Sequence, residues 1–223
     1  LQKFRQIYNK FIVEGGKACT EFIKTGKFKI EDIFIMENSL QKYQNIKGFD
    51  NYHLNLVSAK EMEQISTLKT PADILIVAVK AEESLEIMKQ TNKSAIYMDD
   101  VQDPGNVGTI IRIADWFGIE VVLRSSGTAD FFNPKVVQAT MGSMTNVDLI
   151  TAELSELTNY NRTIYGTYMD GSPLYNESIE SNAIIVMGNE GNGISTVHEK
   201  LIHKKISIPG ADHRIADSLN VAI

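Results

Sequence analysis

The chain has 223 residues, of which 43% are hydrophobic and 22% are charged, a composition typical of a globular protein. No apolar run approaches the roughly 20 residues that a membrane-spanning helix needs, and the first residues do not resemble a signal peptide. We therefore expect a cytoplasmic protein without a membrane association. The single cysteine, Cys19, excludes an internal disulfide and favours a reducing compartment, and we expect it in the core. None of the four histidines has the spacing of metal ligands, so we predict no metal site.

The net charge of −6 argues at first against a nucleic-acid partner. The charge is unevenly distributed, however. Residues 1–80 contain 12 Lys and Arg against 9 Asp and Glu, whereas residues 81–223 contain 10 against 19. A nucleic acid would therefore be expected at the mildly basic front of the chain, although unpatterned surface charge explains so small a difference equally well.

The front of the chain alternates between helical and strand-like patterns. Helices are predicted over residues 1–10, between Gly16 and Gly26, and over 59–66. Strands are predicted over 11–13, 33–36, 54–57 and 74–79. This alternation predicts a small α/β sandwich. Its basic residues, each of which also suits a solvated surface, are candidates for phosphate contacts: Lys24, Lys27, Lys29, Lys42 and Lys47.

A Glu- and Lys-rich stretch at 80–94 reads as a partly helical linker, since it has no Pro or Gly. Beyond it, strands are predicted over 95–98, 119–123, 163–167, 183–187 and 206–208. Helices are predicted over 107–117, from about residue 134, and near 195–202. Strands and helices that alternate in this way predict an α/β domain with a mainly parallel sheet.

The most informative stretch runs from the predicted strand at 95–98 into a polar turn and the helix at 107–117. Asn106 is a suitable N-cap for this helix, and five apolar side chains follow helical spacing on its buried face: Val107, Ile110, Ile111, Ala114 and Phe117. Arg112 points away from that face. Asn106 and Arg112 thus lie beyond the carboxyl end of a strand, where open α/β sheets bind ligands. The alternative is that Asn106 is only a cap and Arg112 only a solvated residue.

Two later stretches share this arrangement of a strand followed by a polar loop. In the first, Gly188, Gly191 and Gly193 surround Glu190, and the glycines allow close approach of the backbone to a ligand. Their order does not fit a dinucleotide-binding fingerprint, and an ordinary glycine turn is the alternative. In the second, Asp217, Ser218 and Asn220 are small hydrogen-bonding residues at the start of what is predicted to be another helix, and another N-cap is the alternative.

Taken together, three motifs resemble, in order, those of the SpoU (TrmH-like) RNA ribose 2'-O-methyltransferases. They are D-P-x-N-x-G-x-x-x-R at 103–112, G-N-E-G-x-G-I-S at 188–195, and I-P followed by D-S-L-N-V at 208–221. The front of the chain is similar to the substrate-binding domain attached to many of these enzymes, with V-E-G at 13–15 and L-K-T-P at 68–71 as landmarks. The resemblance implies a substrate (RNA)-binding domain at 1–80, a linker at 81–94 and a methyltransferase domain at 95–223.

The resemblance further implies a homodimer with a C-terminal trefoil knot, dependence on S-adenosyl-L-methionine, and a structured RNA substrate, ribosomal RNA rather than transfer RNA. By the family's pattern a further helix should begin where the given sequence ends. Two alternatives remain: a transfer RNA 2'-O-methyltransferase, and a non-catalytic RNA-binding protein on the same fold. A dehydrogenase-type nucleotide site is disfavoured by the glycine order.

The resemblance also assigns roles to residues. Arg112 lies at the target ribose, and because arginine keeps its proton in proteins, we expect it to orient the hydroxyl and its phosphate while a phosphate oxygen takes the proton. Four further residues would fix Arg112 and the substrates: Asn106, Glu190, Ser218 and Asn220. The cofactor would be held around Met187, Gly188, Asn189, Ile208 and Leu219, with Thr140 and Gly142 closing over it. Asp217 stands where the family usually has Glu.

Overall fold

The computed structural model describes residues 2–216 and 218–223 and divides into two compact units, each described by itself. The first unit contains Leu1–Glu82 and Asp130–Thr145, and the second contains Glu83–Ala129 and Asn146–Ile223. The division by packing differs from the ranges predicted above, because the segment 130–145, expected in the methyltransferase domain, packs with the front of the chain.

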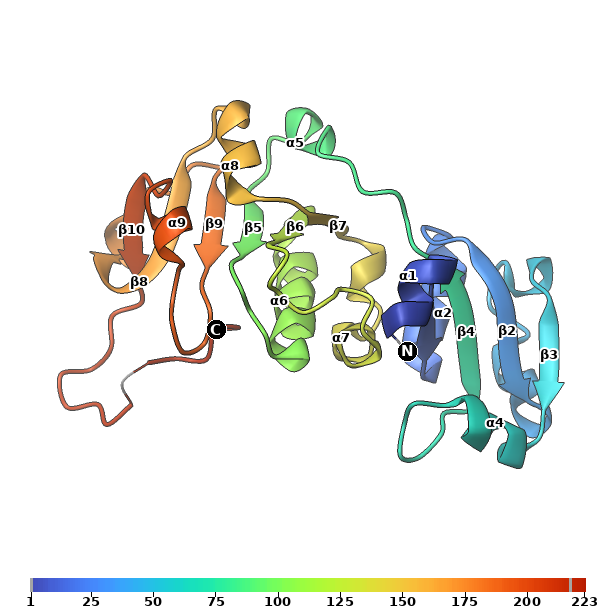
Figure 1. Cartoon of the computed structure of the whole chain (residues 1–223). Coiled ribbons are helices and arrows are strands. Elements are labelled where there is room, and N and C mark those ends of the chain that lie inside the picture. Colours follow the sequence, from blue (N-terminus) through green and yellow to red (C-terminus); the bar gives the residue numbers. More distant parts are fainter. Residues whose placement is uncertain (1, 217) are drawn as a thin grey trace. The chain divides into compact units, whose positions relative to one another are not determined.

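The first unit is built on a four-stranded mixed sheet (Figure 1). The strand order is β1-β4-β2-β3, with β4 antiparallel to both β1 and β2 and with β3 parallel to β2. The strands are β1 Lys10–Glu14, β2 Ile30–Met36, β3 Leu54–Val57 and β4 Ile74–Val79; the helices are α1 Gln2–Tyr8, α2 Gly16–Thr25, α3 Leu40–Tyr43, α4 Ala59–Ile65 and α7 Pro134–Thr140. The predicted α/β character of this region is confirmed.

Local sequence explains the helices of this unit. In α2, Ala18, Phe22 and Ile23 are buried as predicted, and Gly26 ends the helix in the left-handed conformation. Cys19 on the same helix is fully buried, and burial raises the pKa of its thiol. Ser58 begins α4 with a capping box, because its hydroxyl accepts from Glu61 N while its own backbone N–H donates to the Glu61 carboxylate.

Aromatic packing and one ion pair join the segment 130–145 to this unit. The Phe132 ring lies 4.7 Å from that of Phe11 on β1 and 6.3 Å from that of Phe28. The Arg5 guanidinium of α1 bonds the Asp130 carboxylate over 2.9 Å. These partners are more than 100 residues apart in the sequence, so local patterns do not reveal that they pack together.

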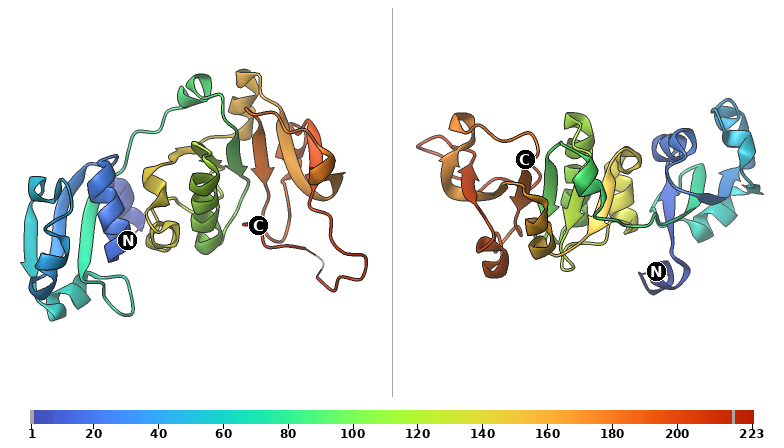
Figure 2. Two further views of the ribbon diagram at one scale, coloured as in Figure 1. Left: turned by 180° about the vertical axis from the view of Figure 1, so that it is seen from behind. Right: turned by 90° about the horizontal axis from the view of Figure 1, so that it is seen from above.

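The second unit contains a six-stranded, fully parallel sheet of order β10-β8-β9-β5-β6-β7, which confirms the predicted parallel sheet. Figure 2, from above, shows α6 on one face and α8 and α9 on the other. The strands are β5 Ala95–Met98, β6 Val121–Arg124, β7 Asp148–Thr151, β8 Ile164–Pro173, β9 Ile184–Met187 and β10 Lys204–Ser207; the helices are α5 Ile87–Gln90, α6 Pro104–Phe117, α8 Leu154–Leu157 and α9 Thr196–Glu199. Of these, β7 and α8 were not predicted.

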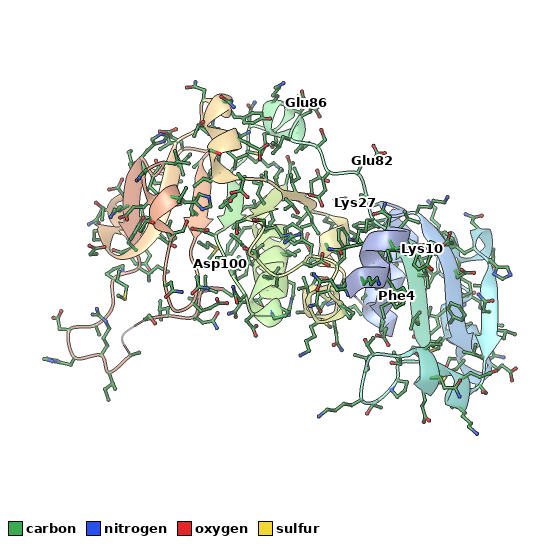
Figure 3. All side chains as sticks on the ribbon, viewed as in Figure 1. Phe4, Lys10, Lys27, Glu82, Glu86 and Asp100 are labelled. Atoms are coloured by element: carbon green, nitrogen blue, oxygen red, sulfur yellow. The ribbon has the colours of Figure 1, made fainter. Side chains whose placement is uncertain are left out.

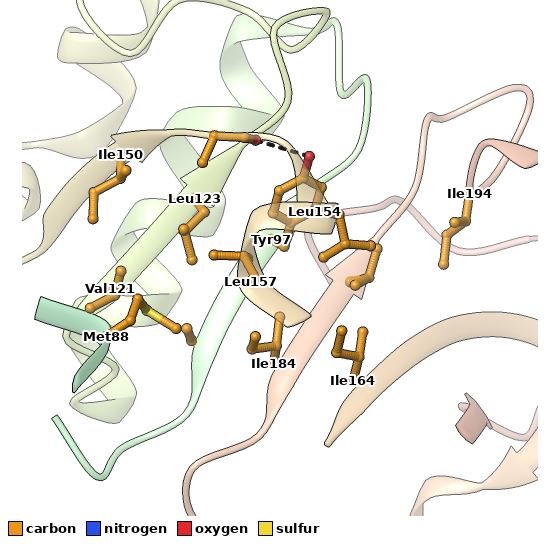
Figure 4. Packing of buried hydrophobic residues seen from close by; sticks show 13 residues of the cluster. Met88, Tyr97, Val121, Leu123, Ile150, Leu154, Leu157, Ile164, Ile184 and Ile194 are labelled. Atoms are coloured by element: carbon orange, nitrogen blue, oxygen red, sulfur yellow. Dashed lines mark hydrogen bonds between the residues drawn. The ribbon is translucent and has the colours of Figure 1, made fainter. Parts of the chain in front are cut away.

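The core of the second unit lies between this sheet and α8. Leu154 and Leu157 of α8 pack on Tyr97 and Ile184 of the sheet (Figure 4). The buried Tyr97 hydroxyl donates to the Ala152 carbonyl over 3.1 Å, so its polar end is satisfied. No helix in the described part of the chain is both long and apolar enough to cross a membrane.

Two local predictions about α6 were wrong. The predicted helix 107–117 begins at Pro104, and Asp103 rather than Asn106 is its N-cap, because the Asp103 carboxylate accepts from Asn106 N over 2.9 Å. Phe117 is 74% exposed, since the buried face of α6 ends at Ala114. Residues 218–223 end in a turn closed by a bond from Ile223 N to the Asn220 carbonyl.

Candidate functional site

The first two sequence motifs meet at the carboxyl ends of β5 and β9. These strands are parallel neighbours, with Met98 opposite Met187, and Asp99 N extends the pairing by donating to the Met187 carbonyl over 2.8 Å. Asp100, labelled in Figure 3, follows at this edge of the sheet. Residues 188–195, hereafter the glycine loop, leave the end of β9 beside it. This edge is where parallel α/β sheets bind ligands.

Glu190 connects the glycine loop to the start of α6. Its carboxylate accepts from Asn106 Nδ2 over 2.9 Å and from the backbone N–H groups of Gln102 and Asp103 over 3.3 Å each. Burial alone would raise the pKa of Glu190, but the hydrogen bonds from Asn106 and the backbone outweigh it and hold the pKa below its ordinary value. Two residues predicted to act together, Asn106 and Glu190, are thus in direct contact.

Asn189 closes the glycine loop on itself. Its Oδ1 accepts from Gly191 N and Asn192 N over 2.9 Å each, while its Nδ2 donates to the Asp100 carbonyl over 2.7 Å. Backbone bonds in both directions pair Asn189 with Gly193. A Cβ on Gly188 would lie 2.5 Å from Ile194 N, so the tight return of the chain requires glycine there.

Arg112 lies on the solvent side of α6, as predicted from the helical spacing. Within the described residues its guanidinium has no hydrogen bond or ion pair. An arginine that is both exposed and unpaired is available to bind an anion such as a phosphate. The structure shows no direct contact between Arg112 and the Asn106–Glu190 pair.

The third motif is largely exposed. Ile208 is 45% and Leu219 55% accessible, and Ser218 is also on the surface. The Asn220 side chain accepts from Ala222 N over 2.8 Å; among the described residues, neither Ser218 nor Asn220 bonds another predicted site residue. Asp217 lies outside the described residues. The chain then returns toward the carboxyl ends of β9 and β5 (Figure 1), and Ala222 is buried.

Thr140 and Gly142, predicted to close over the cofactor, belong to the first unit. The Thr140 hydroxyl is buried and donates to the Val137 carbonyl over 2.7 Å, so its side chain stabilises the end of α7. Gly142 has a φ of +98°, and a Cβ there would lie 3.0 Å from Glu21 Cβ on α2. The other predicted site residues are in the second unit.

Family models match both parts of the sequence. Residues 93–223 match the SpoU rRNA Methylase family and residues 1–76 match the MRM3-like substrate binding domain. The chain belongs to the SpoU rRNA methylase family. The resemblance inferred from the three motifs is therefore confirmed. The first two SpoU motifs lie in the segments that follow β5 and β9.

Curated SpoU-type relatives cover nearly the whole chain. It is 29% identical to 23S rRNA (guanosine(2553)-2'-O)-methyltransferase RlmP of Bacillus subtilis, covering 100% of this chain and 88% of the relative. It is 31% identical to 23S rRNA (guanosine-2'-O-)-methyltransferase RlmB of Neisseria meningitidis, covering 96% and 87%.

Solved structures of related proteins superpose on nearly the whole chain. A TrmH-family protein from Porphyromonas gingivalis superposes with a TM-score of 0.87 at 31% identity, covering 100% of this chain and 88% of the other. An AdoMet-bound rRNA methyltransferase from Sinorhizobium meliloti does so with a TM-score of 0.85 at 25% identity, covering 100% and 86%.

Two buried residues of this SpoU chain escaped the sequence analysis. Asp99 and His198 lie behind the glycine loop, and the Asp99 carboxylate accepts from Ser195 N over 2.7 Å. The position of Asp99 directly after β5 was a signal that could have found it. His198 lies on a short helix with no motif around it, so the sequence held no signal that could have found it. No group of His, Cys, Asp and Glu in the described part of the chain is arranged to hold a metal ion.

Proposed function

We propose that this protein transfers a methyl group from S-adenosyl-L-methionine to a ribose 2'-hydroxyl of ribosomal RNA. The observation that carries the proposal is the hydrogen bond between Asn106 and Glu190, which joins two SpoU motifs at the ligand-binding edge of the parallel sheet. Asn106 lies on the same helix as the unpaired Arg112. Membership of the family and relatives named as 23S rRNA 2'-O-methyltransferases support the reaction and the substrate class.

The residues assigned to the cofactor suit its chemistry. None of those in the second unit carries a charge: Met187, Gly188, Asn189, Ile208 and Leu219. A site without cationic side chains avoids repulsion of a sulfonium, and the exposed apolar side chains of Ile208 and Leu219 offer contacts for an adenine ring. When bound, S-adenosyl-L-methionine supplies an activated methyl group.

Arg112 would hold the RNA. Methyl transfer is an in-line displacement, so rate depends mainly on the alignment of the hydroxyl. A guanidinium binds a phosphate through two parallel N–H groups, which would fix the nucleotide next to the reacting hydroxyl. Since arginine keeps its proton, we assign proton removal to a phosphate oxygen of the RNA and not to Arg112.

Asn106 and Glu190 would keep α6 and the glycine loop in register, so that Arg112 and the cofactor face the same ribose. Ser218 and Asn220 are proposed to complete this arrangement from the third motif. Their exposure leaves both side chains available to a bound substrate.

The first unit is proposed to bind RNA, in line with its match to a substrate-binding domain. Part of its positive charge is neutralised internally: Lys42 pairs with Asp73 over 2.9 Å and Lys24 with Glu21 over 3.4 Å. Lys29 is exposed and is a better candidate for a phosphate contact. The relatives reported above are bacterial, and we place the reaction in the cytoplasm, where bacterial ribosomes are.

We further propose a homodimer and a trefoil knot. Trp116 is 85% and Phe117 74% exposed in the last turn of α6, and large apolar side chains so exposed are often covered by a partner; here we propose a second copy. The knot is supported by the return of the chain beyond β10 to the ends of β9 and β5, with Ala222 buried. Sedimentation of the wild type and of Trp116→Glu tests the dimer: wild type sedimenting as a monomer contradicts it.

The test of the activity is methyl transfer from labelled S-adenosyl-L-methionine to bacterial ribosomal and transfer RNA fractions. We expect label at ribose oxygens of ribosomal RNA, lost in Arg112→Ala and strongly reduced in Arg112→Lys, because a lysine lacks the two-pronged geometry. Lys89→Ala, which removes an exposed cation on α5, is the matched control and should label like the wild type.

Each alternative has its own result. Label confined to transfer RNA supports a transfer RNA enzyme. Absence of label, despite binding of both RNA and cofactor, supports a non-catalytic RNA-binding protein. Loss of label in Lys89→Ala as well would show that Arg112 has no special role.

A further inference from the structure

A buried carboxylate and an imidazole lie behind the glycine loop, outside the residues assigned so far. The side chains of Asp99 and His198 are only 2% and 8% exposed, and Asp99 Oδ1 lies 2.9 Å from His198 Nδ1, although the angle is not that of a hydrogen bond. The other oxygen, Oδ2, accepts from Ser195 N over 2.7 Å. One carboxylate therefore contacts both α9 and the exit of the glycine loop.

The entrance of the loop is held independently. Asn189 donates to the carbonyl of Asp100, the residue next to Asp99. Consecutive residues beyond β5 thus hold the two ends of the loop, one through a neutral backbone oxygen and the other through a charged side chain.

Carboxylates and an aromatic ring lie close to His198. Its Nε2 lies 3.7 Å from the Glu153 carboxylate, so the ring has a carboxylate at each nitrogen. The Tyr97 ring meets it edge-on at 5.5 Å. A buried carboxylate is costly unless its oxygens have partners. The Ser195 N–H supplies one at Oδ2, and the His198 ring lies against Oδ1.

We propose that Asp99 is a positioning residue for the glycine loop, holding its exit through Ser195 N while the buried His198 ring lies against the other oxygen of the carboxylate. The proposal rests on the role of this loop in cofactor binding put forward above. The bond from Ser195 N to Asp99 Oδ2 fixes the exit of the loop, and the buried His198 ring keeps the carboxylate in the orientation that accepts it.

Three variants separate charge from shape. Asp99→Ala removes the acceptor of Ser195 N and should weaken cofactor binding about tenfold, the scale expected from a small misplacement. Asp99→Asn keeps an acceptor oxygen without the charge and should bind almost as tightly as the wild type. His198→Asn removes the ring that lies against Oδ1 and should weaken binding less than Asp99→Ala does.

The test combines two measurements on the full chain. Calorimetric titration with S-adenosylhomocysteine reports affinity. Amide hydrogen exchange at 191–195 without any ligand reports the hold on the loop directly. His53→Asn, which replaces an exposed histidine of the first unit, is the control and should match the wild type in affinity and exchange. Thermal unfolding of every variant verifies that it is folded.

Faster exchange and weaker binding in Asp99→Ala, with both restored in Asp99→Asn, support the inference. Unchanged exchange in folded Asp99→Ala, or exchange in Asp99→Asn as fast as in Asp99→Ala, overturns it, and wild-type exchange in His198→Asn overturns the part assigned to the ring. Faster exchange with unchanged affinity also overturns it, and assigns the failure to the proposed cofactor role of the loop, since the hold by Asp99 would then be demonstrated.

Discussion

The side-chain amide of Asn106 donates to the carboxylate of Glu190 over 2.9 Å, although the two residues are 84 positions apart in the chain. The bond fixes the first turn of α6 against the glycine loop, and two backbone donors from Gln102 and Asp103 reinforce it. Glu190 therefore acts as the acceptor that joins the first two SpoU motifs.

Glu190→Gln should destabilise the protein at neutral pH by about 1 kcal/mol, a modest value because solvent screens an exposed carboxylate. Hydrogen bonds lower the folded-state pKa of Glu190 below its ordinary 4.5. Its stabilisation is thus present above that value and is lost as pH falls through the lower folded pKa. Urea unfolding of both proteins at several pH values checks this; a difference that persisted unchanged at about pH 2 would contradict it.

Gly188→Ala should weaken cofactor binding about tenfold, because its Cβ would lie 2.5 Å from Ile194 N and would force the glycine loop open. Gly191→Ala is the matched control. A Cβ there meets only Asn189 Oδ1 at 3.7 Å, so binding should be almost unchanged. Calorimetric titration with S-adenosylhomocysteine measures the affinity of both variants. Equal affinities would show that the tight return of the loop is irrelevant to cofactor binding.

Arg162→Met should destabilise the second unit by about 3 kcal/mol, since buried carbonyls lose their donor. The buried guanidinium donates to four backbone carbonyls at 2.5–3.0 Å, those of Met88, Thr91, Lys93 and Asn182. Burial also lowers its pKa. Denaturant unfolding measures the loss. Arg214→Met, on the surface, should change stability by less than about 0.5 kcal/mol; equal effects would contradict the role of the four bonds.

Asp103→Ala should cost about 1 kcal/mol by removing the N-cap of α6, whereas Asp103→Asn should cost only a few tenths. The cap bond runs from Asn106 N to Asp103 Oδ1 over 2.9 Å. Thermal unfolding of the two variants checks the order. If Asn106 were the cap, as its sequence position suggested, Asp103→Ala would have little effect.

The sequence of the second unit predicted its parallel sheet because β-branched and apolar runs at 95–98 and 183–187 are separated by helices and bounded by turn residues. It did not predict β7, since Asp148–Thr151 is too short and too polar at its ends to stand out. The sequence also led us to place the N-cap of α6 at Asn106 rather than at Asp103, because both residue types are good N-caps. Only the hydrogen bond from Asn106 N to the Asp103 carboxylate distinguishes them.

The sequence by itself determined the family and the chemistry offered by the three motifs, because spacing along a chain fixes which groups follow each strand. Only the tertiary structure decided which of them touch. Asn106 contacts Glu190, and Arg112 has no partner in the described residues. The packing of 130–145 with the first unit and the Asp99–His198 contact were likewise decided by the fold. Such contacts join residues far apart in the chain, and their geometry depends on sheet order and side-chain packing, which no local pattern encodes.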